Sequence, residues 1–297
     1  MSMKVAYKTS AKVFEQVSKR NNPGLPSDLK SLRKNEIIVV KGQHDHVEKI
    51  IDAIGIPYTL MKRENNYSEN NNDNTSTRKN LDKQLKNYEG SRVLFVNCAS
   101  YEDNIPAESV REFVKRGGRL VTTDWALDFA AKAFPGHLFK REETTDDVVE
   151  IKCFTPLAQK LIGLHYSECH PKWWLEGSSY LYQISTDTIP IITSPEMKER
   201  YGQDCVAAGF MHGRGEVLHF ISHFELQRTH QRTSMDRGDL EEFLKNMSAS
   251  RTKEMAGVSV AELEAAYSTI NTVAHLCARA PLLNPASYGT KSVLKKA

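Results

Sequence analysis

The chain has 297 residues, of which 40% are hydrophobic and 26% are charged, enough for a substantial core in one large domain or two small ones. Its 40 basic residues nearly cancel its 37 acidic ones, and the net charge of +3 argues against nucleic-acid or membrane-surface partners held by bulk charge. No apolar run approaches the roughly 20 residues of a membrane span, and the first residues contain no apolar signal core.

The five cysteines are widely spaced, odd in number and without a CxxC pair. Disulfide frameworks and common metal knuckles use paired cysteines at short spacing. We therefore expect reduced thiols and a cytoplasmic protein.

The first predicted elements belong to an α/β pattern. Residues 1–35 are expected to form an N-terminal extension, in which 11–20 could be helical. The apolar run EIIVV (36–40) predicts the first buried strand, 46–53 its crossover helix and 56–61 a second strand.

An Asn-rich polar insert, ENNYSENNNDNTSTRKN, occupies residues 64–80. It has almost no apolar side chains to bury, so we expect a mobile, disordered loop. A functional lid is the alternative to a variable surface insert.

A strand–helix–strand unit from 92 to 127 is the clearest pattern in the chain. Apolar residues at 93–96 and 119–123 predict two buried strands, and Val110, Phe113 and Val114 recur at the spacing of a helical stripe between them. Such units have right-handed crossovers and parallel strands. In open α/β sheets the chemistry lies beyond the carboxyl ends of those strands, which directs attention to the residues that follow them.

The second half of the chain predicts mixed elements and an aromatic-rich segment at 165–185 that reads as irregular. A capping box at Ser259 and Glu262 opens an amphipathic helix, expected to dock on the sheet or else to bind a partner. The chain thus divides into a domain at 36–250 and a C-terminal helix and tail at 251–297. The other expected elements are strands at 147–154, 188–194, 204–212 and 216–224, the last two as a hairpin, and helices at 128–134, 155–163 and 238–247.

Residues 36–247 resemble the class I glutamine amidotransferase-like superfamily, in particular its trehalose-utilisation (ThuA-like) branch. The segments that carry the resemblance are GQHDH (42–46), VREFVKRGGRLV (110–121), HGRGEVLHFISHF (212–224) and the His-x-Glu of His223 and Glu225. The resemblance implies an α/β fold with a mostly parallel, flavodoxin-like sheet, helices on both faces and a C-terminal helix. It also implies that His223 is a base and that Glu225 orients it.

The sequence departs from that family where a nucleophile is expected. Catalytic members carry a cysteine in a Gly-x-Cys-x-Gly elbow, whereas this chain has TTDWA at 122–126, with Asp124 (or Trp125, if the register slips by one) in the cysteine's place. Glutamine hydrolysis needs a thiolate nucleophile. Glutaminase activity is therefore not expected.

Several polar residues should converge at the carboxyl ends of the strands, and they leave three interpretations open. They could be a degenerate site that binds a ligand or a protein. Alternatively, Asp124 and His223 could form an acid/base pair oriented by Glu225, or His44 and His46 could hold a divalent metal that activates water. Nucleophilic chemistry at Cys98 is the third interpretation, against its being an ordinary buried residue. The convergent residues are His44, Asp45, His46, Cys98, Asp124, His223 and Glu225.

Two other histidine groups have simpler interpretations. His165, Cys169 and His170 have the spacing of metal ligands but lack a second pair. His219 is expected to be a core histidine rather than a ligand.

The sequence therefore predicts a non-glutaminase, amidotransferase-like domain that acts as a ligand- or protein-binding module. The alternative is a hydrolase or isomerase centred on Asp124, His223 and Glu225, with or without a metal. A divalent metal is the one cofactor considered. A protein partner or a second copy is considered, whereas nucleic acid and a membrane span are not.

Overall fold

A seven-stranded sheet forms the centre of the described part of the protein. The computed structural model describes residues 3–61, 74–86, 93–100, 105–164, 171–225, 240–255 and 258–283. The strand order is β2-β1-β3-β4-β11-β10-β9, parallel from β2 to β11 and antiparallel from β11 to β9. The strands are β1 (Ile37–Val40), β2 (Thr59–Met61), β3 (Val93–Val96), β4 (Arg119–Thr123), β9 (Ile189–Thr193), β10 (Cys205–His212) and β11 (Gly215–Phe220).

The burial of the three inner parallel strands explains why the sequence predicted them. Every residue of β1, β3 and β4 is buried, as is expected when helices cover both faces of a parallel sheet. Val39 pairs with Phe95, and Phe95 with Val121, so the segments predicted at 36–40, 93–96 and 119–123 lie side by side. The predicted fold class, a mostly parallel α/β sheet, is confirmed.

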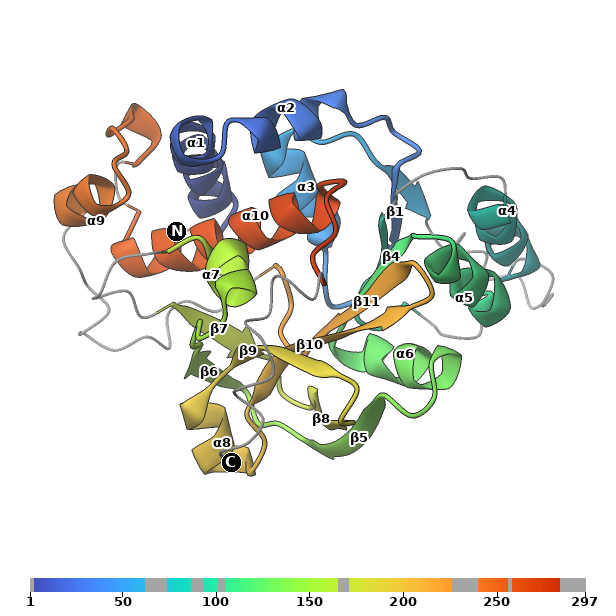
Figure 1. Cartoon of the computed structure of the whole chain (residues 1–297). Helices are drawn as coiled ribbons and strands as arrows, with labels where there is room; N and C mark the ends of the chain where they lie inside the picture. The colour runs from blue at the N-terminus through green and yellow to red at the C-terminus, as the bar shows by residue number, and fades with distance from the viewer. Residues whose placement is uncertain are drawn as a thin grey trace.

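Helices lie on both sides of this sheet (Figure 1). One layer consists of α1, α2, α3, α7 and α10, which pack against one another, and the other contains α4, α5 and α6. The helices are α1 (Met3–Asn21), α2 (Gly24–Ser31), α3 (Val47–Ile54), α4 (Asn74–Lys86), α5 (Ala107–Lys115), α6 (Leu127–Ala133), α7 (Pro156–Ile162), α8 (Pro195–Tyr201), α9 (Leu240–Asn246) and α10 (Val260–Cys277).

Helix α10 is docked along most of its length. The predicted capping box is formed: the Ser259 hydroxyl accepts from the backbone N–H of Glu262, and the Glu262 carboxylate accepts from that of Ser259. The helix packs against α1, α3 and α7, and the Ser10 hydroxyl of α1 donates to the Leu263 carbonyl. The N-terminal helix, longer than the predicted 11–20, is therefore part of the same layer.

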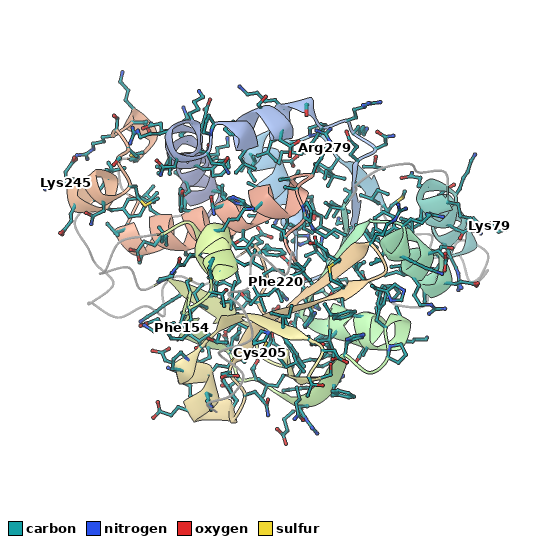
Figure 2. All side chains as sticks on the ribbon, in the orientation of Figure 1. Lys79, Phe154, Cys205, Phe220, Lys245 and Arg279 are labelled. Carbon is teal, nitrogen blue, oxygen red and sulfur yellow. The ribbon has the colours of Figure 1, made fainter. Side chains whose placement is uncertain are left out.

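The segment predicted to be irregular contains two strands, so that prediction is wrong for its described part. Strand β7 (Lys172–Leu175) pairs with β6 (Asp147–Glu150), and β8 (Tyr180–Ile184) pairs with β5 (Leu138–Glu143), both antiparallel. Aromatic residues favour strands, and two of these, Trp173 and Tyr182, are fully buried. In Figure 2 the interior near Phe220 is filled with side chains, whereas Lys79 and Lys245 stand at the surface.

The Asn-rich insert is also partly corrected. Residues 74–80 begin helix α4, because Leu81 and Leu85, four residues apart, are buried beside α5. The rest of the insert lies outside the described residues, as do His165, Cys169 and His170. Among the helices that are described, none has the length and apolar character that crossing a bilayer would take.

Candidate functional site

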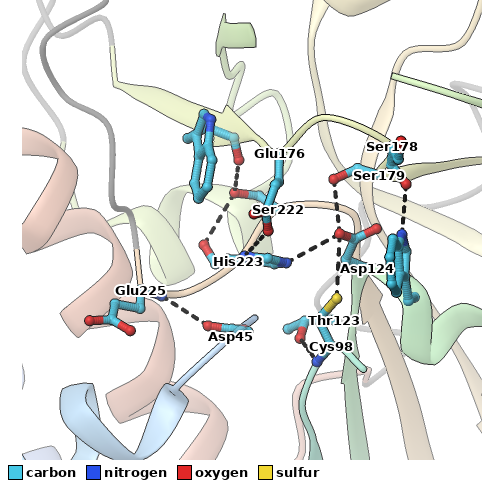
Figure 3. Close-up of polar contacts among 12 residues, drawn as sticks. Asp45, Cys98, Thr123, Asp124, Glu176, Ser178, Ser179, Ser222, His223 and Glu225 are labelled. Atoms are coloured by element: carbon cyan, nitrogen blue, oxygen red, sulfur yellow. Dashed lines mark hydrogen bonds and ion pairs between the residues drawn. The ribbon is translucent and has the colours of Figure 1, made fainter. Parts of the chain in front are cut away.

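Four parallel strands end at one edge of the sheet and are followed by polar residues (Figure 3). Asp45 follows β1, Cys98 follows β3, Asp124 follows β4 and His223 follows β11. All four side chains are buried. Four of the seven residues that the sequence predicts at the carboxyl ends thus lie at one edge of the sheet, at the place where α/β sheets carry their sites.

Asp124 lies on a sharp strand–turn–helix elbow. It follows β4 directly and opens the short 3-10 helix η2 (Asp124–Ala126), after which α6 begins. Its φ of 44° falls in the left-handed region, which is strained for a residue with a side chain, though aspartate tolerates it better than most. Strained backbone of this kind is concentrated at functional sites.

The Asp124 carboxylate is held from three directions. Its Oδ2 accepts from the Ser179 hydroxyl at 2.9 Å and lies 3.1 Å from His223 Nε2, while its Oδ1 accepts from the Tyr180 N–H at 3.0 Å. Asp124 is 2% exposed and His223 1%. The carboxylate thus joins the end of β4, the end of β11 and the turn before β8.

His223 lies between carboxylates. Its Nδ1 is 3.2 Å from Glu176 Oε2, within ion-pair distance but without hydrogen-bond geometry. Burial acts to lower the pKa of His223, but the hydrogen bond to Asp124 and the nearby charges of Asp45, Asp124 and Glu176 outweigh it and raise that pKa. The site therefore favours positive charge at this position.

Cys98 approaches the same carboxylate. Its Sγ lies 3.6 Å from Asp124 Oδ2, and its backbone N–H donates to the Thr123 hydroxyl. Burial, followed by the charge of Asp124, raises the thiol pKa far above its ordinary value. In this arrangement Cys98 carries a protonated thiol, which is a poor nucleophile.

The carboxylate of Glu225, expected to orient His223, has a different partner. Lys49 Nζ binds both of its oxygens at 2.7 and 2.8 Å. The Glu225 backbone N–H donates to Asp45, which also accepts from the backbone of Phe224. Glu176, on the turn after β7, is the carboxylate that lies beside the second nitrogen of His223.

His44 and His46, the expected metal ligands, stand beside the cluster rather than in it. The His44 ring meets the Trp125 ring edge-on at 5.3 Å, and His46 Nδ1 lies 3.3 Å from Glu48 Oε1. The described residues contain one group of three side chains with metal-ligand spacing, namely Cys98, Asp124 and His223, whose ligand atoms lie within 4.8 Å of one another.

Glu176 and Ser179 are site residues that the sequence did not reveal, whereas Tyr180 belongs to the aromatic residues that could line a ligand pocket. Glu176 and Ser179 lie in EGSS, between two aromatic β-forming runs, WWL and YLY. That arrangement of turn residues between strands was the available signal for a tight turn. Nothing local indicates that the turn would fold over the distant elbow at Asp124.

No protein-family model matches the sequence, and no curated protein matches it. Solved structures similar to the chain include a glutamine amidotransferase from Methylobacillus flagellatus, 14% identical, covering 83% of this chain and 93% of its own with a TM-score of 0.44. A ThuA-like protein from Bacteroides uniformis is 10% identical and covers 65% of this chain and 83% of its own, with a TM-score of 0.41. For a glutamine amidotransferase from Thermotoga maritima the identity is 9%, the coverage 64% and 76%, and the TM-score 0.41. At these identities and TM-scores the likeness is one of fold alone.

Proposed function

We propose that this chain is a non-glutaminase, amidotransferase-like module that uses the cluster around Asp124 to bind a ligand or a partner. The proposal depends on which side chains occupy the elbow at Asp124 and on what they contact. The residue in the nucleophile's place is a carboxylate already engaged by His223, Ser179 and Tyr180. The nearest thiol, Cys98, is held protonated by burial and by Asp124, which raise its pKa. A site with these groups has no free thiolate for attack on an amide. The described cysteines are all free thiols, which suits the reducing cytoplasm.

A glutaminase assay tests the negative half of the proposal. The full chain is incubated with L-glutamine, and released glutamate is measured for the native protein and for Cys98→Ser. We expect both to match the uncatalysed background. Release by the native protein that disappears in Cys98→Ser would overturn the proposal.

Native mass spectrometry tests the binding half. The full chain should retain a ligand or a second copy, seen as mass above that of the single 33.6 kDa chain. Asp124→Asn should lose that added mass, whereas Lys245→Ala, at the surface of α9, should keep it. A native protein that carries no added mass would contradict a binding role.

A second candidate is hydrolysis or isomerisation by Asp124 and His223. The observation in its favour is the positive φ of Asp124 beside an imidazole 3.1 Å away. In this scheme the carboxylate acts as base or nucleophile and His223 as its proton partner, with Glu176, rather than Glu225, beside the imidazole. Activated esters serve as probe substrates. Turnover that falls at least about 100-fold in His223→Gln would favour this candidate, and equal turnover would reject it.

A further inference from the structure

The cluster of Cys98, Asp124 and His223 unites one soft and two harder metal ligands in a buried site. The three residues follow β3, β4 and β11, and each side chain is at least 98% buried. Thiolate, imidazole and carboxylate together are typical ligands of zinc. Figure 3 shows the thiol and the imidazole directed at the same carboxylate.

Two of the three distances between the ligand atoms match those on a tetrahedral ion. Zinc lies about 2.3 Å from sulfur and about 2.0–2.1 Å from nitrogen and oxygen, so tetrahedral angles separate sulfur from oxygen by about 3.5 Å and nitrogen from oxygen by about 3.3 Å. In the structure Cys98 Sγ is 3.6 Å and His223 Nε2 is 3.1 Å from Asp124 Oδ2. The third pair, Cys98 Sγ and His223 Nε2, lies within 4.8 Å, so side-chain rotations would bring these two atoms onto a shared ion.

Residues around the three candidate ligands could orient them, as hydrogen-bonding neighbours orient metal-binding histidines in other proteins. If His223 Nε2 binds the ion, its Nδ1 faces the Glu176 carboxylate 3.2 Å away, and a hydrogen bond formed there would fix the ring and increase its basicity as a ligand. Tyr180 and Ser179 donate to Asp124 and fix the orientation of its carboxylate. His223 Nδ1 has no hydrogen-bond partner within the described structure, so the imidazole is not already held by a complete network.

Charge balance also favours a divalent ion. With a thiolate at Cys98, a carboxylate at Asp124 and a neutral His223, the three ligands carry a charge of −2, which a divalent cation cancels. A bound divalent ion favours the thiolate form of its cysteine ligand. The proton of the thiol and that of the imidazolium leave to solvent as the ion enters.

We propose that Cys98 Sγ, Asp124 Oδ2 and His223 Nε2 form a mononuclear zinc site, with Glu176 as the residue that positions His223. This proposal names the ligand of the site described under the proposed function and rests on it. Because all three ligands are buried, we expect the metal to enter as the chain folds and to exchange slowly with chelators.

Metal content of the full chain tests the site. Protein expressed with added zinc is analysed by inductively coupled plasma mass spectrometry, and we expect about one zinc per chain for the native protein. Cys98→Ser, Asp124→Asn and His223→Gln should each lose most of it. Two matched controls, Cys205→Ser and His219→Gln, replace buried residues away from the cluster and should keep it. Cys169→Ser tests the other candidate spacing in the sequence and should also keep it.

Cobalt reports the ligands directly, and far-UV circular dichroism of each variant guards against misfolding. The native chain refolded with Co²⁺ should show a thiolate-to-cobalt charge-transfer absorption that is absent in folded Cys98→Ser and present in Cys205→Ser. Glu176→Gln should keep the absorption but weaken metal affinity by about 10–100-fold.

A native protein that is free of zinc, and that acquires neither zinc nor cobalt on refolding, would overturn the site. So would a charge-transfer absorption that survives in Cys98→Ser. If that protein still lacks glutaminase activity and retains a non-metal ligand or a second copy, the proposed function stands and only the metal assignment fails.

Discussion

Asp124 makes contacts that neither of its neighbours could replace. Its carboxylate accepts from the Ser179 hydroxyl and the Tyr180 N–H, and it faces His223 across 3.1 Å. A buried carboxylate of this kind fixes the geometry of a site as well as its charge. Three segments far apart in the chain depend on this one side chain for their polar contacts.

Asp124→Ala should therefore destabilise the protein strongly. The substitution leaves buried donors and an imidazole without their partner, and we expect the free energy of unfolding to fall by about 3–5 kcal/mol. Asp124→Asn keeps an acceptor oxygen and tolerates the positive φ, so its loss should be smaller, about 1–3 kcal/mol. Urea unfolding measures both. An alanine variant as stable as the native protein would show that these contacts do not stabilise the fold.

His219 should make the protein acid-sensitive. It is completely buried on β11, with Nδ1 2.9 Å from the Thr122 hydroxyl, and burial lowers its pKa to about 3. The unfolded chain binds a proton at this histidine below about pH 6.5, whereas the native state remains neutral until about pH 3. Its contribution is thus present above pH 6.5 and is lost as the pH falls toward 3, by up to about 1.4 kcal/mol per pH unit.

His219→Gln isolates that contribution because glutamine does not titrate. Free energies of unfolding measured at several pH values between 7 and 4 should fall less steeply in this variant than in the native protein. Cys205→Ser, which also replaces a buried residue, is the control. The slope of its free energy of unfolding against pH should equal that of the native protein. Identical slopes for His219→Gln and the native protein would contradict the prediction.

Only some of the individual residues of the candidate site could be predicted from the sequence. Asp124 and His223 follow strands that the sequence reveals, and topology alone places such strand ends at one edge. Glu176 and Ser179 could not be found in this way, since they lie on a turn whose position depends on two small antiparallel pairs, β5–β8 and β6–β7. Likewise, the ion pair between Lys49 and Glu225 depends on how α3 packs in the folded protein, and no sequence pattern near Glu225 predicts it.

At the scale of elements, the segments that follow β1 and β3 approach so closely that only a glycine fits at position 42. A Cβ on Gly42 would lie 2.1 Å from the Cys98 carbonyl oxygen and 2.8 Å from Asn97 Cβ. The Gln43 N–H donates to that same carbonyl, so the two strand ends are also hydrogen-bonded. The position of Cys98 relative to the rest of the site follows from this close contact.

Gly42→Ala should push the two strand ends apart. We expect a loss of about 1–3 kcal/mol in the free energy of unfolding, the usual cost of forcing an extra methyl into a packed place. The matched control is Gly24→Ala in α2, where a Cβ would meet nothing closer than 3.9 Å and should be neutral or stabilise by up to about 1 kcal/mol. Equal effects of both substitutions, measured by urea unfolding, would contradict the close contact.

The sequence predicted the elements best where burial is two-sided and least well where it is not. Strands β1 and β3 are continuous apolar runs, β4 contains Leu120 and Val121, and the side-by-side arrangement of the three followed from βαβ topology. The hairpin of β10 and β11 was likewise indicated by the turn at Gly213 and is formed. By contrast, α4 begins in a polar stretch and depends on Leu81 and Leu85 packing beside α5, a tertiary contact that composition does not reveal.

For the whole molecule, a buried ion pair connects the sheet to the segment after α10. Arg119 of β4 binds Glu216 of β11 at 2.7 Å and donates to the carbonyls of Leu276, Ala278 and Ala280. The second Glu216 oxygen accepts from the backbone N–H groups of Leu282 and Leu283, in the segment after α10. Nearly every polar group in the pair is satisfied, as burial of two charges requires.

Arg119→Met should loosen this segment and destabilise the fold. It leaves Glu216 buried without its cation, so we expect a loss of about 3–5 kcal/mol in the free energy of unfolding. Hydrogen–deuterium exchange should quicken at residues 278–283, while the amides of β1 and β3 change least. Arg116→Met, at an exposed arginine, is the control and should cost less than about 1 kcal/mol. Unchanged exchange at 278–283 would show that the ion pair does not hold the segment.

The pairing of α1 with α10 has a consequence for biosynthesis. The Ser10 hydroxyl and the Leu263 carbonyl that meet in the native protein are 253 residues apart. At roughly 5–20 residues per second, a ribosome needs on the order of 13–50 s to make the intervening polypeptide. Throughout that interval the nascent α1 lacks one of the helices that cover it, so holding chaperones should bind there until translation supplies α10.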